Sequence, residues 1–393
     1  MPLRIQQSGS DSAFDVDSAL RDDVLVCPLT KRRLVELGLE EAERSICGGA
    51  KFLTRAEEHV APIGRTPRVL VRDDGGCAYP IVDGVPVLLA PEMLMRPDQL
   101  QSFDLFSPQY AEAYEEMDYY SSVSGAAVKV VEEGLETADE RRTTFHELAS
   151  ALGAPETARA SFPHPREIWI DARFDAAAQW EGYVHLSPVA GKRVLQLGGD
   201  GRQAVKFLAA GAKEAIVVSP MLGELSFARA LAHHARLADR LLTIAGIAEE
   251  IPLGNETVDV IWAGGCVHHM VTELALPEIA RILRPGGKFA SIEPWRAPFY
   301  GIGTKILGKR EPDVHCRPMS AARVEPLFAA FDEARVVHHG SLTRYALIAL
   351  ERLGYSVKIS TAWKINTVDD FVCSFVPPLR RAGSSVALLG SVS

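Results

Sequence analysis

From residue 191 to about residue 300, short apolar runs rich in valine and isoleucine alternate with longer stretches of helical spacing. Strands that alternate with helices of ten or more residues are typical of a parallel β-sheet with crossover helices. The predicted strands cover residues 192–197, 215–218, 241–244, 258–262 and 288–293. Two later apolar runs, at 334–338 and 386–389, are predicted to add a sixth and a seventh strand, with a helix over 343–353 in the inserted chain between them.

The chain before residue 190 has different sequence patterns. Residues 1–22 are polar and are expected to form a flexible tail. Residues 23–95 combine short apolar runs with Pro and Gly turns, which predicts a small β-rich module. Residues 96–189 carry apolar and aromatic residues every three or four positions, which predicts a helical connector or lid. The sheet domain then occupies residues 190–393.

Length and charge narrow the classes of protein. A chain of 393 residues favours two or three domains. Its 51 acidic residues against 42 Lys and Arg give a net charge of -9, which disfavours a nucleic-acid partner because phosphate binding needs basic residues. Six scattered cysteines without a CxxC pair are typical of a reducing compartment, so we expect a cytoplasmic protein. No secretory signal and no apolar stretch of roughly 18 to 20 residues is present, so no membrane partner is expected.

A glycine-rich turn follows the first strand of the predicted sheet and contains Gly198, Gly199 and Gly201. Glycine lets the backbone turn tightly and approach a ligand closely, and the first N–H groups of the following helix are free to bind it. A tight turn that binds no ligand is the alternative. The loops after the next three strands should meet this turn at the carboxyl edge of the sheet, where open α/β folds bind ligands. These loops cover residues 219–222, 246–252 and 263–270.

An ordered series of motifs along residues 190–300 is more specific than any of its members. The series comprises the glycine turn, Ser219-Pro220-Met221, Glu249-Glu250-Ile251-Pro252, Asp259-Val260-Ile261, His268-His269 and Leu283-Arg284-Pro285-Gly286-Gly287. With it the chain resembles the class I S-adenosylmethionine-dependent methyltransferases, especially the subgroup of ubiquinone and menaquinone methyltransferases. The resemblance implies an α/β fold with a Rossmann-like methyltransferase sheet, parallel except for an antiparallel last strand. It also implies S-adenosyl-L-methionine as cofactor.

The resemblance further implies which residues contact the cofactor. These are Gly198, Gly199 and Gly201 at the methionine and ribose end, Ser219 and Met221 beside ribose and adenine, Ala248 and Glu249 near the adenine, and Gly264 beside the sulfonium. The family usually has acids where Gln196 and Ser219 stand, and often where Ile247 stands; a hydroxyl is a weaker acceptor than a carboxylate. These departures leave a non-catalytic methyltransferase-like scaffold as an alternative.

The N-terminal module carries a second resemblance. Its predicted strands include residues 24–29, and its Cys27-Pro28-Leu29-Thr30 start and its closing run at 79–89 resemble the small zinc-ribbon-type proteins that activate tRNA, rRNA and release-factor methyltransferases. Zinc-binding members have a second cysteine where Thr30 stands, and Cys47 and Cys77 lack close partners, so no metal is expected. The resemblance leaves methylation of RNA or of a translation factor as a further alternative, which the acidic charge disfavours.

Candidate groups for the chemical step lie past the fourth and fifth strands. His268 is suited to act as a general base near neutral pH, and Glu293 to act as a base or as a substrate anchor. His315 belongs to a basic stretch, residues 305–317, that suits an anionic acceptor. The structural alternatives are a packing role for His268 and a place in a solvated loop for Glu293 and His315. The resulting hypothesis is an enzyme that methylates an oxygen, nitrogen or carbon of a small, anionic molecule in specialised metabolism, with a homodimer left open.

Overall fold

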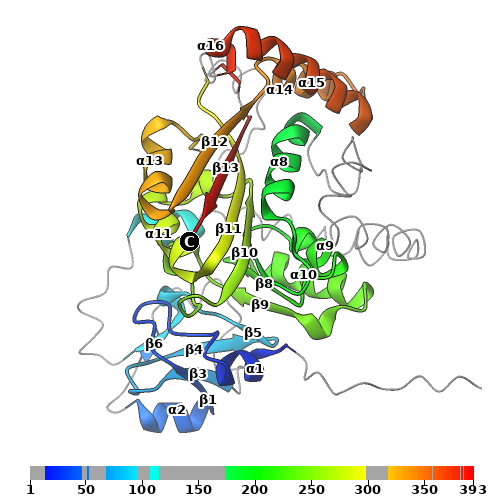
Figure 1. Ribbon diagram of the computed structural model, residues 1–393. Coiled ribbons are helices and arrows are strands. Elements are labelled where there is room, and N and C mark those ends of the chain that lie inside the picture. Colours follow the sequence, from blue (N-terminus) through cyan, green and yellow to red (C-terminus); the bar gives the residue numbers. More distant parts are fainter. Residues whose placement is uncertain are drawn as a thin grey trace, which may run out of the picture.

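The computed structural model describes residues 14–46, 51–52, 68–95, 107–114, 173–297, 317–355, 357–380, 382–383 and 385–393. These residues form an α/β domain and a smaller β-rich module, which lies below the domain in the view of Figure 1. Within the described part of the chain, no helix has the length and apolarity that crossing a bilayer requires.

The larger domain is built on a seven-stranded sheet with the order β12-β13-β11-β10-β7-β8-β9. Its strands are β7 (Arg193–Leu197), β8 (Glu214–Ser219), β9 (Leu241–Ala245), β10 (Val258–Gly264), β11 (Leu283–Pro294), β12 (Glu333–His339) and β13 (Ser385–Ser391). The strand β13 runs antiparallel to both of its neighbours, β11 and β12, whereas the pairs from β11 to β9 are parallel. The predicted fold, with its antiparallel last strand, is thus confirmed.

Helices cover both faces of this sheet, so the domain has three layers (Figure 1). One face is covered by α8 (Ala176–Leu186), α9 (Arg202–Ala209) and α10 (Leu222–His234), and the other by α11 (Thr272–Ile282) and α13 (Ala321–Ala330). Short 3-10 turns occur at η5 (Arg173–Asp175), η6 (Ala238–Arg240), η7 (Ala248–Glu250) and η8 (Val267–His269). Because both faces are covered, every residue of β7 and β9 is buried, and most of these residues are apolar.

The helix α8 lies at the end of the predicted helical connector or lid, residues 96–189, and packs on β11 and β13. Its Tyr183 stacks on Trp262 of β10 with the ring centroids 4.4 Å apart. A Cβ added to Gly182 would lie only 2.8 Å from the same indole ring, so the helix approaches the sheet closely at this glycine. The end of the predicted connector is therefore a layer of the sheet domain.

The N-terminal module contains a six-stranded sheet in the order β1-β3-β4-β6-β2, with β5 paired to β4. Its elements are α1 (Val16–Arg21), β1 (Leu34–Gly38), α2 (Leu39–Ser45), β2 (Lys51–Phe52), β3 (Arg68–Arg72), β4 (Cys77–Val82), β5 (Val85–Pro86), η2 (Ala90–Glu92) and β6 (Leu94–Met95). Two predictions are wrong here. Residues 16–21 are a helix with a capping box at Asp15 rather than part of a flexible tail, and residues 24–29 form only isolated bridges at Leu25 and Val26 rather than a strand.

The module is joined to the open edge of the large sheet. Val87 pairs in parallel with Ala245 at the end of β9, and the N–H of Leu88 donates to the Ala245 carbonyl at 2.7 Å. The N–H of Val26 donates to the carbonyl of Pro252 at 3.1 Å. One continuous cluster of buried apolar side chains runs through both parts. The module therefore covers the edge strand and supports the loop that follows it.

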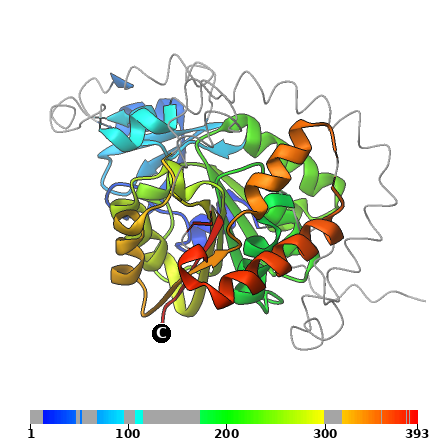
Figure 2. The ribbon, with the colours of Figure 1, turned by 90° about the horizontal axis from the view of Figure 1, so that it is seen from above.

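The chain between β12 and β13 forms α14 (Thr343–Arg352), α15 (Ile359–Phe375) and α16 (Pro377–Arg380). Figure 2 shows these helices, in orange and red, lying across one end of the domain. Asp369 of α15 holds them to the turn before α14, because one carboxylate oxygen accepts from the N–H groups of Ser341, Leu342 and Thr343 at 2.7 to 2.8 Å.

Candidate functional site

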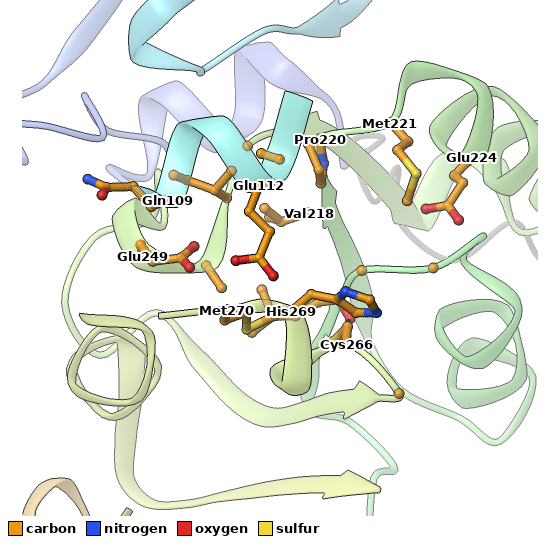
Figure 3. A pocket seen from close by; sticks show the side chains of 18 of the residues that line it. Gln109, Glu112, Val218, Pro220, Met221, Glu224, Glu249, Cys266, His269 and Met270 are labelled. Atoms are coloured by element: carbon orange, nitrogen blue, oxygen red, sulfur yellow. The ribbon is translucent and has the colours of Figure 1, made fainter. Parts of the chain in front are cut away.

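A pocket opens at the carboxyl ends of β7, β8, β9 and β10, and a short helical segment, residues 108–114, lies over it (Figure 3). Its lining residues are Gln109, Glu112, Ala113, Leu197, Gly198, Gly199, Val218, Pro220, Met221, Glu224, Gly246, Ile247, Ala248, Glu249, Gly264, Gly265, Cys266, His269 and Met270. Six of the eight residues proposed for the cofactor are among them, and Gly201 and Ser219 are not. Contact between these eight residues and a cofactor stays a prediction.

The glycine turn after β7 brings backbone to the pocket wall. Gly198 has a φ of 66°, in the left-handed region that favours glycine. A Cβ at this position would lie 2.9 Å from the Cβ of Cys266, whose thiol donates to the Leu197 carbonyl at 3.1 Å. Because Gly198 has no side chain, the turn packs closely against Cys266 on one side and leaves room for a ligand on the other.

Gln196 occupies the position where the family usually has an acid, and it braces this turn. Its amide nitrogen donates to the Gly198 carbonyl at 2.9 Å, and its amide oxygen accepts from the N–H of Ala204 in α9 at 2.8 Å. The side chain is 2% exposed, so both polar atoms depend on these partners.

Replacing Gln196 by glutamate is expected to lower the free energy of unfolding by about 1–3 kcal/mol. The carboxylate can still accept from Ala204, but its other oxygen then faces the Gly198 carbonyl without a proton to donate. Urea denaturation of Gln196→Glu measures the loss. A variant as stable as the wild type would show that the amide nitrogen does not hold the turn.

Gly201 has a packing role that the sequence does not reveal. It begins α9 with a φ of 76°, and a Cβ there would lie 2.3 Å from the Cβ of Ala228 in α10. This glycine lets α9 and α10 approach each other. The resemblance implied that Gly201 contacts the cofactor, but Gly201 does not line the pocket.

Ser219 is fully buried at the end of β8, and its hydroxyl is engaged within the protein. The hydroxyl donates to a carboxylate oxygen of Glu224 at 2.9 Å and accepts from the N–H of Met221 at 3.2 Å. Glu224, in the first turn of α10, lines the pocket (Figure 3). The carboxylate missing at the strand end is thus supplied by a residue five positions later, which the sequence analysis did not identify.

The loop after β9 forms the opposite wall. Ile247 and Ala248 are buried apolar residues, and a carboxylate oxygen of Glu249 accepts from the N–H of Val271 at 2.7 Å. This bond ties the loop after β9 to the loop after β10. The wall combines a flat apolar surface with one carboxylate.

Glu293 and His268, both proposed for the chemical step, bind each other beneath the pocket. Glu293 is 1% exposed, and its carboxylate accepts from Nδ1 of His268 at 2.6 Å and from the N–H groups of Val267 and His268 at 3.0 and 3.2 Å. It also accepts from the hydroxyl of Ser291. Burial opposes ionisation, but the neighbouring His268 and these bonds together lower the pKa of Glu293. Neither residue lines the pocket, so the geometry gives them a positioning role for the loop after β10.

The neighbouring histidine takes the place in the pocket that was predicted for His268. His269 lines the cavity, and its ring lies 4.0 Å from the ring of His268, measured between centroids. The third residue proposed for the chemical step, His315, lies outside the described residues.

Two tyrosines fix the helical segment 108–114 over the pocket. The hydroxyl of Tyr110 donates to both carboxylate oxygens of Glu250, at 2.5 and 2.6 Å, and the hydroxyl of Tyr114 donates to Glu92 of the N-terminal module. Burial raises the pKa of Tyr110 and of Glu250. Because the tyrosines are four residues apart, they share one face of the helix. Gln109 and Glu112 both line the pocket, and the side chain of Glu112 is directed into it (Figure 3).

The thiols of the N-terminal module lie together in its core. Cys27 and Cys77 are buried, and the sulfur of Cys27 is 3.3 Å from the hydroxyl of Tyr79. The hydrogen bond from Cys77 lowers the pKa of the Cys27 thiol. Cys47 lies outside the described residues, and within those residues no three side chains of His, Cys, Asp or Glu gather as metal ligands would.

Comparison with known proteins identifies the sheet region. Residues 195–291 match a family model described as a methyltransferase domain. This stretch has the Rossmann-like fold of a methyltransferase domain. An uncharacterized methyltransferase of Mycobacterium bovis is 31% identical over 153 residues, which are 39% of this chain and 54% of that relative. The ubiquinone/menaquinone biosynthesis C-methyltransferase UbiE of Rubrivivax gelatinosus is 30% identical over 122 residues, 30% of this chain and 47% of that protein.

The chain thus spans about half the length of the curated relatives it matches. Among solved structures, a geranyl diphosphate methyltransferase in complex with SAM is 18% identical, with a TM-score of 0.42 over 56% of this chain and 85% of that one.

The pocket of the methyltransferase domain fits S-adenosylmethionine. Gly198 and Gly199 bring bare backbone to one wall, Met221 and Ala248 supply apolar surface for a flat ring, and Glu224 supplies an acceptor for hydroxyl groups. Adenosine needs both an apolar slot and hydroxyl acceptors, and both are present. The cofactor predicted from the sequence therefore agrees with the residues that form the site.

Proposed function

We propose that this protein transfers a methyl group from S-adenosylmethionine to a small-molecule acceptor. The observation that carries the proposal is the pocket that begins at the bare Gly198–Gly199 backbone, within the stretch that matches a methyltransferase domain. S-adenosylmethionine, when bound, supplies an electrophilic methyl group.

The residues of the chain would act mainly by positioning. Gly198 and Gly199 would bind through backbone atoms, and Glu224 would accept from hydroxyl groups. The helical segment 108–114, held by its two tyrosines, would cover the ligands and exclude water. His269 lines the pocket and is the residue we propose to receive a proton from an acceptor that must lose one.

The class of acceptor is only partly supported. The predicted anionic acceptor rests on residues 305–317, of which the structure describes only Arg317, and Arg317 forms an ion pair with Glu112. No lysine or arginine occurs among the described residues that line the pocket. We therefore do not extend the proposal to an anionic acceptor. Membership of the ubiquinone and menaquinone subgroup is favoured by the likeness to one such enzyme, whereas specialised metabolism stays a prediction.

Calorimetry with S-adenosylhomocysteine tests the proposal. Wild-type protein is expected to bind, and Gly198→Ala to bind at least about tenfold more weakly, because the new methyl group meets Cys266 at a φ that disfavours side chains. Gly286→Ala is a matched control, since Gly286 also has a positive φ but its added Cβ meets nothing within 4 Å. A wild-type protein that binds no S-adenosylhomocysteine at millimolar concentration would favour the non-catalytic scaffold instead.

A further inference from the structure

The described lining of the pocket carries acidic side chains and no lysine or arginine. The acidic side chains are those of Glu112, Glu224 and Glu249. Glu224 is bound by the hydroxyl of Ser219, and Glu249 by the N–H of Val271. Glu112 differs from both, because it comes from the helical segment 108–114, whereas Glu224 belongs to α10 and Glu249 to η7.

Glu112 has one engaged and one unengaged carboxylate oxygen. Its Oε2 forms an ion pair with Arg317, whose side chain is 46% exposed. Its Oε1 is buried and has no hydrogen-bond partner among the residues that the structure describes, and the residue as a whole is 9% exposed. In Figure 3 the carboxylate projects from the helix into the space between Glu249 and His269. Leaving a buried charged oxygen without a partner is costly, so a ligand that supplies one is favoured.

The wall formed by the glycine turn offers no charged side chain to a ligand. Gln196, which stands beneath the glycine turn, is neutral, and both of its polar atoms are engaged with Gly198 and Ala204. Among the described carboxylates of the lining, Glu112 is the one with a buried oxygen that has no hydrogen-bond partner, so a positive group in this pocket finds an open acceptor on the helical segment 108–114.

We propose that Oε1 of Glu112 is a subsite for a cationic group of the methyl donor. This inference rests on the proposed function. It implies that the helical segment 108–114 distinguishes charged from uncharged ligands. S-adenosylmethionine carries two such groups, a sulfonium and an α-ammonium. S-adenosylhomocysteine keeps only the ammonium, and 5′-methylthioadenosine has neither.

The three compounds allow a direct test by calorimetry on the full chain. In Glu112→Gln, the Kd for S-adenosylmethionine is expected to rise about tenfold, because hydrogen bonds to charged groups contribute on this scale. The Kd for 5′-methylthioadenosine is expected to stay within about twofold of the wild-type value. Weakening of S-adenosylmethionine alone assigns the subsite to the sulfonium, and equal weakening of S-adenosylhomocysteine assigns it to the ammonium.

Arg317→Gln is the matched control, because it removes the other half of the ion pair. If Glu112 only holds the helix in place, both variants should weaken all three ligands alike, which would overturn the inference. If Glu112 binds a cation, Arg317→Gln should leave S-adenosylmethionine binding unchanged or tighter. An unchanged Kd for S-adenosylmethionine in Glu112→Gln would also overturn it. Failure of the wild type to bind any of the three would instead overturn the proposed function, and this inference with it.

Discussion

Replacing Glu293 by glutamine is expected to lower the free energy of unfolding by about 3–5 kcal/mol, the range observed when one partner of a buried charged pair is removed. The carboxylate is fully enclosed, and its oxygens accept from two backbone N–H groups, from Nδ1 of His268 and from Ser291. Glutamine keeps the shape but turns one acceptor into a donor that faces other donors. Urea denaturation of wild-type and Glu293→Gln protein measures the difference.

The difference in unfolding free energy between wild type and Glu293→Gln is expected to depend on pH. The pKa of Glu293 is lowered in the folded protein, so its contribution is complete above the pKa of an unfolded glutamate, about 4.3. It is lost as the pH falls through the lower pKa of the folded state. The gap between wild type and Glu293→Gln should therefore narrow on acidification below about pH 4.3. Ser291→Ala is the milder control, since it removes one bond only; an equal loss in both variants would contradict a central role for the carboxylate.

The sheet could be predicted because its signal is local. The strands β7, β8, β9 and β10 each contain a short run of mostly apolar residues, as expected where helices cover both faces of a parallel sheet. The position of the glycine turn was predictable for the same reason, because Gly198 and Gly199 follow a strand directly. The antiparallel direction of the last strand came from the family resemblance.

The side chains that face the pocket depend on distant contacts and could not be predicted. His268 and His269 have the same local context, and only the bond from His268 to Glu293, 25 positions later, decides which of them turns away. Glu112 reaches the pocket because Tyr110 and Tyr114 bind residues of the loop after β9 and of the N-terminal module. Likewise, α8 joins the sheet layer through a contact between Tyr183 and Trp262 that no spacing reveals.

The N-terminal module is expected to be indispensable to the methyltransferase domain. A chain that starts at residue 96 loses the Leu88 N–H that binds Ala245, the strand-like pairing of Val87, and the bond from Val26 to Pro252. It also exposes apolar side chains of the shared cluster, and each fully buried aliphatic side chain contributes roughly 1.5–3 kcal/mol. About five such side chains already reach the stability of a typical domain, about 5–15 kcal/mol.

We therefore expect the shortened chain to aggregate or to lose its cooperative thermal transition, as followed by circular dichroism and size-exclusion chromatography. A chain that lacks only residues 1–13 is the control and should melt as the full chain does, because it keeps every contact described for the module, including the bond from the Phe14 N–H to the Asp239 carbonyl. Co-expression of residues 14–95 should restore a soluble domain, since the two parts meet through backbone pairing and a common core. A chain from residue 96 that is monodisperse, melts at the wild-type temperature and binds S-adenosylhomocysteine would show that the module is an independent attachment, and that the loop after β9 holds its shape without it.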